Sequence, residues 1–411
     1  MEADLRLAFA CAAVAFGLLY AWPLARRWLP EAGRLTVGLT AFGLGLGALS
    51  MWMFALALLP GALSLASVLA LPVVVFAVGV ISHQPSVVSR QSSAATPHPK
   101  LRTADYGLRF TFYLTLVPIA VITVNVLYYP FYYADTLSRY GLFARRIFEA
   151  GGLTEAVQGY PLLVSMGYAL AFFAAGGVND RLAGLVSAAF ATGTVGITYA
   201  LACRMYGRRA ALAAAFLAAT STLFVVWGTS GYVDIPTGFF FGLSALFAYR
   251  WLESGAAGDA WLAGVAAGLA IWTKQAGLAI LPSLALVLAL AVWQVRARHR
   301  MLLGLRGQRS ALALGRPLAL WDYVKGSVAA GAIILLAALV IAGPWYLRNY
   351  LLSGPAAVVP LPGEFYAAQA DHRLVALLPF LTRPAEWGWA FAVLGLGGLL
   401  WGLMPRKHLE A

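Results

Sequence analysis

The sequence has 411 residues, of which 61% are hydrophobic and only 11% are charged. Soluble globular domains are nearer half apolar and a quarter charged, so this composition excludes a soluble enzyme, a disordered protein and a secreted disulfide scaffold. The formal net charge is +13, which in a membrane protein indicates cytoplasmic loop charge and no nucleic-acid partner. The sequence therefore predicts an all-α polytopic membrane protein.

About eleven apolar runs have the length of a membrane span, which needs about 20 apolar residues. Glu2 and Asp4 precede the first run, and Arg26 and Arg27 follow it. This charge order is the reverse of a secretory signal peptide, so we expect a retained first span with its N-terminus outside. The predicted spans are 5–22, 35–58, 61–81, 107–127, 183–203, 210–228, 235–252, 259–274, 277–293, 325–346 and 387–403.

Two polar segments interrupt the apolar runs. Ser82–Asp105 is rich in Ser, Pro and basic residues and predicts a flexible linker, and Gln294–Trp321 is strongly basic. The predicted organisation is a three-helix N-terminal extension over 1–82, a cytoplasmic linker over 83–105, a membrane core over 106–355 with an outer loop at 128–182, and an outer loop with a terminal span over 356–411.

The apolar run Tyr160–Gly176 decides the orientation of everything after it. If it does not cross the membrane, the cytoplasmic loops hold a clear excess of Lys and Arg, and a crossing removes that excess. We therefore predict a helix that lies on or dips into the outer leaflet. Thr136–Glu149 has Arg139 on its basic side and predicts a second amphipathic helix, so the outer loop is expected to hold a pair.

Four ionisable residues then fall at similar depth on the outer face: Asp135, Asp234, Lys274 and Arg348. Such groups at span ends are candidates for function. Each has a simpler explanation, because either acid is suited to cap the helix that follows it and either cation is suited to snorkel to the interface. The neighbouring tyrosines, with Tyr133 among them, are typical of a membrane interface, with sugar stacking as the alternative.

These segments resemble the GT-C-type integral-membrane glycosyltransferases, in particular the dolichyl-phosphate-mannose protein mannosyltransferase-like and aminoarabinose transferase-like families. The resemblance covers roughly 107–355. The segments that carry it are the outer loop with Asp135, Tyr160-Pro161 with the helix through Arg208-Arg209, Gly231-Tyr-Val-Asp234, Gly268 to Lys274, and Pro344-Trp-Tyr-Leu-Arg348-Asn-Tyr350.

The resemblance implies a sugar donor linked to polyprenyl phosphate, transfer on the extracytoplasmic face of the cell membrane, and Asp135 as the catalytic residue. The sequence departs from the family in that Thr136, not a second acid, follows Asp135. Proline does not directly precede Asp234, and three spans precede the usual first one. The acceptor is left open between protein, lipid and glycan.

We expect Asp135 to act as general base, with transfer by inversion. Arg348 and Lys274 are expected to bind the leaving phosphate, and Tyr133 and Arg139 to contact substrate. For Asp234 three roles remain open: orienting Lys274 or Arg348, contacting the acceptor, or holding a divalent metal, for which Asp135 is the other candidate.

Two other functions compete with glycosyl transfer. A transporter or lipid flippase is the main alternative, although transporters place ionisable residues near the midplane of paired halves, and no second half repeats the first here. A non-catalytic subunit of a larger membrane complex is the other.

Overall fold

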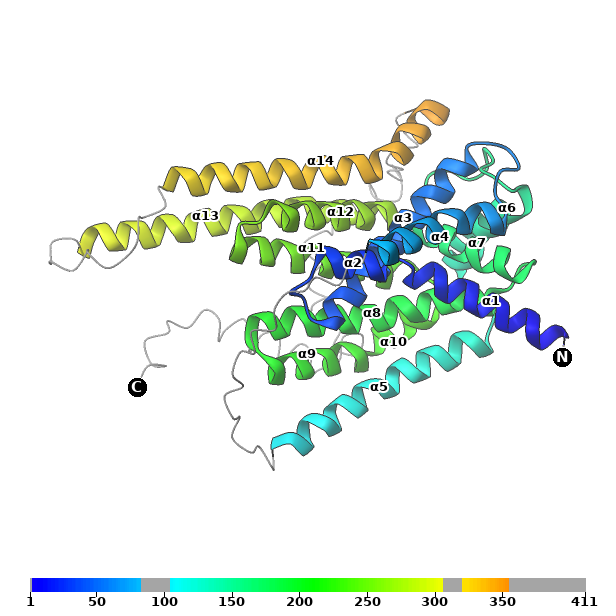
Figure 1. The fold of residues 1–411 in the computed structure, drawn as a ribbon, viewed down its shortest axis with the longest axis horizontal. Coiled ribbons are helices and arrows are strands. Elements are labelled where there is room, and N and C mark those ends of the chain that lie inside the picture. Colours follow the sequence, from blue (N-terminus) through cyan, green and yellow to red (C-terminus); the bar gives the residue numbers. More distant parts are fainter. Residues whose placement is uncertain (1, 83–103, 306–319, 355–411) are drawn as a thin grey trace, which may run out of the picture.

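The computed structural model describes residues 2–82, 104–305 and 320–354, and within these ranges every regular element is a helix (Figure 1). The elements are α1 (Glu2–Leu19), α2 (Trp22–Trp28), α3 (Arg34–Ala57), α4 (Leu65–Ile81), α5 (Ala104–Tyr128), η1 (Thr136–Tyr140), α6 (Gly141–Ala150), α7 (Leu163–Ala175), α8 (Asp180–Tyr206), α9 (Arg208–Thr220), α10 (Thr222–Thr229), α11 (Asp234–Ser254), α12 (Ala257–Thr273), η2 (Gln275–Ala279), α13 (Ile280–Leu305) and α14 (Leu320–Ser353).

Six described helices are long and apolar enough to cross a membrane, and a bent pair makes a seventh if it counts as one span. This confirms the predicted all-α polytopic membrane architecture but not the predicted number of eleven spans. The predicted span 387–403 lies outside the described residues. The six are Asp4–Trp28, Arg34–Ala57, Leu108–Tyr128, Asp180–Tyr206, Gln275–Trp293 and Tyr323–Ser353.

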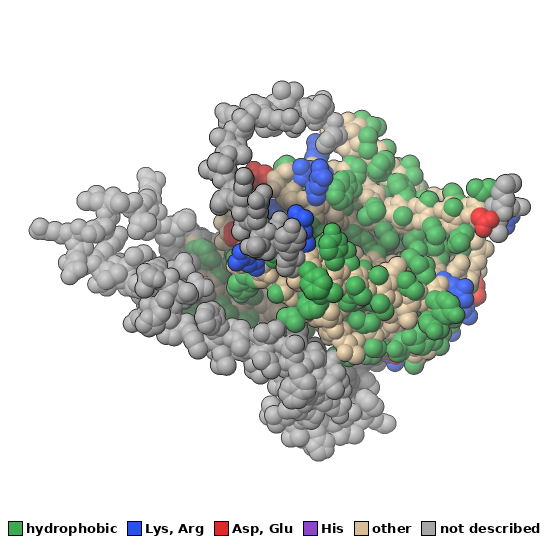
Figure 2. Space-filling model, turned by 90° about the horizontal axis from the view of Figure 1, so that it is seen from below, with side chains coloured by type: hydrophobic (Ala, Val, Ile, Leu, Met, Phe, Trp, Pro, Cys, Tyr) green, Lys and Arg blue, Asp and Glu red, His purple; other side chains and the backbone are tan. Residues whose placement is uncertain are grey.

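The outer surface of the bundle is apolar, as a lipid-facing surface must be. On α5, for example, Phe110 and Val124 are each 65% exposed. On the face drawn in Figure 2, hydrophobic side chains cover much of the described surface, and charged side chains gather toward its two ends. A soluble monomer rarely exposes so large an apolar surface, so lipid is its natural surrounding.

Several predicted spans differ from the observed helices. The predicted span 61–81 is the 17-residue α4, whose start is set by the Ser64 capping box and which is shorter than a membrane needs. The predicted span 210–228 is two helices, α9 and α10, bent by 61° where Ser221 takes an extended backbone conformation. The bend makes this a broken span or a re-entrant loop.

Other differences concern the C-terminal part of the described chain. Helix α12, predicted as the span 259–274, has 17 residues, and neither it nor α11 (predicted as 235–252) is among the candidate spans. Helix α13 continues to Leu305, into the segment predicted as a polar loop, and α14 runs past Pro344 to Ser353. The predicted span ended at 346, shortly after Pro344. Proline is tolerated inside membrane helices, and α14 continues beyond it for about two more turns.

The prediction that Tyr160–Gly176 does not cross the bilayer agrees with the structure, but the alternative in which it lies on the membrane surface does not. Its helix α7 has 13 residues and is therefore about 20 Å long, too short to cross the bilayer. Eleven of those residues are buried, including Tyr168 and Phe172, because α7 packs against α1, α3, α6 and α8. It is thus a buried core helix and has no lipid-facing side. The predicted amphipathic pair reduces to α6 alone, which buries Phe143 and Ile147 and exposes Arg145.

Helix α3 lies at the centre of the bundle, so the N-terminal helices share one hydrophobic core with the predicted catalytic region. The Phe42 ring packs edge-on against Phe190 and Phe239, with centroids 4.9 and 5.3 Å apart. Trp272 of α12 donates a buried 2.8 Å hydrogen bond from Nε1 to the Ser50 Oγ of α3. The core therefore fixes the end of α12, where Lys274 follows, relative to α3.

The bundle has two chemically different ends. One, which we call the loop end, is formed by residues 129–162, 230–234 and 274, and lies at the right of Figure 1. The other, the basic end, carries Arg204, Arg208 and Arg250. The 21-residue α11 runs from the first to the second, a length of about 30 Å that matches the hydrocarbon thickness of a bilayer.

Candidate active site

The segment after α5 is docked on the turn between α10 and α11. Thr136 Oγ1 donates a buried 2.7 Å hydrogen bond to the Ser230 carbonyl, and the Asp135 backbone N–H donates to the Tyr232 hydroxyl at 3.1 Å. Gly231 has a φ of +73°, and a Cβ there would lie 2.8 Å from the Phe131 ring. Only glycine fits this turn without strain, and the docking places Asp135 beside the start of α11.

Asp135 is followed by one turn of π-helix, η1. The Gly141 N–H donates to the Thr136 carbonyl five residues earlier, the wide turn that often occurs at functional sites. The Asp135 side chain makes no capping hydrogen bond, so the capping explanation fails. Its carboxylate instead pairs with Arg139 at 2.9 Å, and both side chains are about 40% exposed.

Arg139 has a second partner. Its guanidinium lies over the Tyr160 ring, 4.4 Å from the centroid, a distance typical of cation–π contact. An exposed ion pair alone contributes little stability, but the two contacts together orient Arg139 beside the Asp135 carboxylate.

The second ion pair joins α11 to α12. Lys274 Nζ lies 2.6 Å from Asp234 Oδ1, and both side chains are partly exposed. Asp234 is the first residue of α11 and Lys274 follows the last residue of α12. Both charges therefore complement the helix dipoles, and Asp234 makes no capping hydrogen bond. Of the roles left open for Asp234, contact with Lys274 is the one observed.

Tyr140 connects the two ion pairs. Burial raises the pKa of the Tyr140 hydroxyl far above its usual value, and the Asp135 and Asp234 carboxylates raise it further, while Arg139 lowers it. Both acids are therefore within electrostatic range of one buried phenol that stays neutral at physiological pH. Two acids separated by almost a hundred positions thus act on the same phenol.

Aromatic side chains form a wall next to Asp135. Trp227 and Tyr232 are stacked with centroids 4.7 Å apart, and Tyr133 meets Tyr232 at 5.6 Å. Tyr129 and Tyr132 are each 50% exposed, as interfacial aromatics are. Tyr133 is less exposed and is the tyrosine of this run that packs against both Trp227 and Tyr232.

Arg348 lies at the same end but has different contacts. Its Nη1 donates to the Val157 carbonyl at 3.0 Å and its Nη2 to the Thr154 carbonyl at 3.3 Å, while its guanidinium stacks over Trp345. Arg348 thus holds the loop between α6 and α7. Gln275 Nε2 donates to the Gly159 carbonyl of that loop at 2.7 Å, which ties the loop to the residue after Lys274.

The two acids are a poor donor set for a metal ion. Each carboxylate already has a cation within 3 Å, and across the described ranges no group of three His, Cys, Asp or Glu side chains is suited to hold a metal. A divalent metal held by Asp135 and Asp234 stays a prediction.

Sequence reasoning gave Tyr140, Tyr160, Trp227 and Tyr232 no role. Tyr232 lies inside the Gly231-Tyr-Val-Asp234 motif, two residues before the acid, and this position could have marked it as a candidate site residue. The Asp135–Arg139 pair follows the i, i+4 spacing of helical ion pairs, which was also visible. Tyr140 carries no local pattern. Tyr160 stands in the Tyr160-Pro161 segment of the resemblance, but only the fold shows that it lies beside Arg139.

Comparison with known proteins supports the resemblance over part of the chain. A family model described as dolichyl-phosphate-mannose-protein mannosyltransferase matches residues 161–321, which confirms the predicted similarity to GT-C glycosyltransferases in that segment. The segment contains Asp234 and Lys274, while Asp135, Arg139 and Arg348 lie outside it. A search of curated protein sequences gave no match.

Among solved structures, the chain is similar to ArnT from Cupriavidus metallidurans, crystallised with undecaprenyl phosphate. The two are 20% identical, with a TM-score of 0.43, over 60% of this chain. The match spans 43% of the ArnT chain, less than half of that protein's length.

Proposed function

We propose that this protein is an integral-membrane glycosyltransferase that moves a sugar from a polyprenyl-phosphate-linked donor to an acceptor on the extracytoplasmic face. The observation that carries the proposal is the pairing of two acids with two cations around Tyr140 at the loop end of a membrane bundle. The matched family model supports the donor class, since its description names a sugar carried on dolichyl phosphate.

The Asp135 carboxylate is the proposed general base. It is partly exposed, so an acceptor hydroxyl can approach it, and the backbone bond to Tyr232 fixes its position. Asp135 takes the proton from the acceptor hydroxyl as that oxygen bonds to the anomeric carbon. The bond from this carbon to the phosphate oxygen breaks with its electron pair, which releases polyprenyl phosphate.

Lys274 and Arg139 are the proposed cations for the departing phosphate. Both are partly exposed and face the site through their ion pairs with Asp234 and Asp135. A phosphate that carries more negative charge as the bond breaks is stabilised by cations already in place. Arg348, the cation favoured from the sequence, is assigned to holding the loop near Val157.

The aromatic wall of Tyr133, Trp227 and Tyr232 is the proposed surface for the sugar ring. Direct displacement by the acceptor inverts the anomeric carbon. Protein, lipid and glycan acceptors all supply the required hydroxyl.

The test is a transfer assay in membranes that contain the overproduced protein. A panel of polyprenyl-phosphate donors with radiolabelled sugars is supplied, and label in the protein, lipid and glycan fractions is counted together with released polyprenyl phosphate. Asp135→Asn is expected to lower the rate by about 10²–10⁴-fold, the usual effect of losing a general base.

Glu149→Gln is the matched control, because Glu149 is an exposed acid of the same loop outside the site, and it is expected to keep the wild-type rate. A wild-type rate in Asp135→Asn removes the proposed base. No label transfer from any donor of the panel by the wild-type protein contradicts the proposed function itself.

A further inference from the structure

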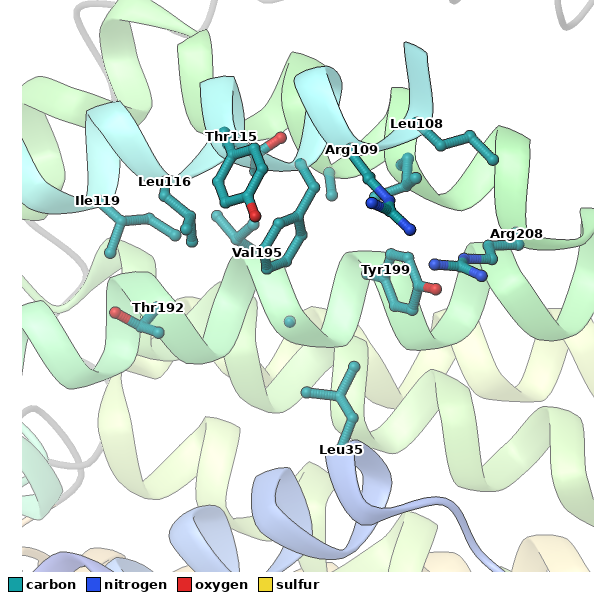
Figure 3. Close-up of a pocket in the computed structure, with 15 residues that line it drawn as sticks. Leu35, Leu108, Arg109, Thr115, Leu116, Ile119, Thr192, Val195, Tyr199 and Arg208 are labelled. Carbon is teal, nitrogen blue, oxygen red and sulfur yellow. The ribbon is translucent and has the colours of Figure 1, made fainter. Parts of the chain in front are cut away.

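A cavity of about 510 Å³ lies between α5, α8 and α9, toward the basic end and away from the proposed active site (Figure 3). Its walls are apolar along most of their length, with Leu116 and Ile119 from α5 and Val195 from α8. Leu35 at the start of α3 closes one side.

The two charged groups of this cavity lie at one end. Thr115 and Thr192 also line it, but their hydroxyls donate to the Thr111 and Ala188 carbonyls of their own helices. An occupant of the inner part therefore meets mainly hydrocarbon surface.

The mouth of the cavity is cationic. Arg109 comes from α5 and Arg208 from the start of α9, and Figure 3 shows both guanidinium groups near the Tyr199 ring. Gly207, with a φ of +85°, makes the turn that brings Arg208 back over α8, and the N-terminus of the 13-residue α9 adds the positive end of its helix dipole.

We propose that this cavity binds one anionic phospholipid of the leaflet at the basic end. Its phosphate lies between Arg109 and Arg208, within reach of the Tyr199 hydroxyl, and one acyl chain fills the apolar part. Such a lipid fits the cavity in two respects. Its negative head group meets two guanidinium groups from separate helices, and its hydrocarbon chain lies against apolar side chains. Basic pockets between membrane helices at the cytoplasmic side are suited to acidic lipids.

This site is independent of the proposed transfer reaction. Tyr199 lies in the half of α8 that is remote from Asp180, where α8 leaves the loop end, and Thr192 lies near the middle of the helix. The occupant is thus a structural lipid that joins α5 to the α8–α9 pair.

The test is native mass spectrometry of the delipidated full-length protein, titrated separately with phosphatidylglycerol, phosphatidylcholine and undecaprenyl phosphate. Wild-type protein is expected to bind one phosphatidylglycerol with at least fivefold preference over phosphatidylcholine. The double variant Arg109→Gln, Arg208→Gln is expected to lose this preference. Arg209→Gln, which changes the next and exposed arginine outside the cavity lining, is expected to keep it.

A second variant tests the apolar part without changing charge. Leu116 is 41% exposed and lines the cavity, so Leu116→Trp is expected to fill the space and to lower phosphatidylglycerol binding at least fivefold while the protein stays folded. Equal binding of phosphatidylcholine, unchanged phosphatidylglycerol binding in the double variant, or loss of undecaprenyl phosphate binding in that variant each overturns the proposal.

Discussion

At the scale of single residues, the two cations Lys274 and Arg348 differ in the groups that they contact. Lys274 and Arg348 are both cations at span ends, but Lys274 pairs with a carboxylate and Arg348 with backbone carbonyls. Because the Arg348 guanidinium already donates hydrogen bonds to two loop carbonyls, it has fewer N–H groups left for a ligand phosphate. Lys274 can exchange Asp234 for a phosphate without releasing any backbone group, which favours it as the phosphate-binding side chain.

Lys274→Gln is therefore expected to raise the KM for the lipid donor about tenfold, equivalent to ~1.4 kcal/mol of binding, with a smaller change in kcat. Lys274→Arg keeps the charge and is expected to recover most of the affinity. The measurement is steady-state kinetics with the donor concentration varied. An unchanged KM in Lys274→Gln assigns the Lys274–Asp234 pair to helix packing alone.

At the scale of helices, close packing depends on small residues. Gly264 of α12 faces α14, and a Cβ there would lie 2.7 Å from the Ile334 Cα and carbonyl oxygen. Gly268 approaches Ala338 of α14 in the same way. Such approach of backbones is the usual basis of helix association in membranes, where the hydrophobic effect adds little.

Gly264→Val is expected to destabilise the protein by about 1–3 kcal/mol, the typical cost of overpacking, because the atoms that a larger side chain meets are backbone and do not move aside. Gly326→Val is the matched control, since a Cβ on this glycine of α14 would meet open space, with no heavy atom within 4 Å. Thermal unfolding followed by tryptophan fluorescence in detergent measures both. Equal midpoints for the two variants contradict the packing described for α12 and α14.

The sequence predicted the helical membrane class and the clustering of charged residues at span ends, because both depend on composition and span length. It did not predict that α7 is buried, because an apolar 13-residue helix has the same pattern inside a protein as at an interface. Nor did it predict the bend between α9 and α10. The position of Tyr140 within electrostatic range of both acids depends on packing between distant segments, which no local pattern encodes.

At the scale of the whole molecule, the two ends have different chemistry. The proposed active site, the loop from Gly151 to Leu162 and the aromatic wall lie at the loop end, and Arg204, Arg208 and Arg250 lie at the other. Because Lys and Arg are enriched on the cytoplasmic side of membrane proteins, the loop end is expected to face outward.

Cysteine accessibility in intact cells tests this orientation in a background of Cys11→Ala and Cys203→Ala. Glu155→Cys, at an exposed position of the loop end, is expected to react with a membrane-impermeant maleimide. Gly258→Cys, exposed at the basic end, is expected to react only after the membrane is permeabilised. The opposite labelling pattern places the proposed active site in the cytoplasm.

We propose that Asp135, Arg139, Asp234 and Lys274 form one site for a sugar linked to polyprenyl phosphate. A cryo-EM map of the protein with such a donor bound shows where its phosphate and its sugar lie. We predict phosphate density against Lys274 and Arg139, with the anomeric carbon beside the Asp135 carboxylate. Phosphate density away from both cations, or a sugar out of reach of Asp135, would contradict this assignment.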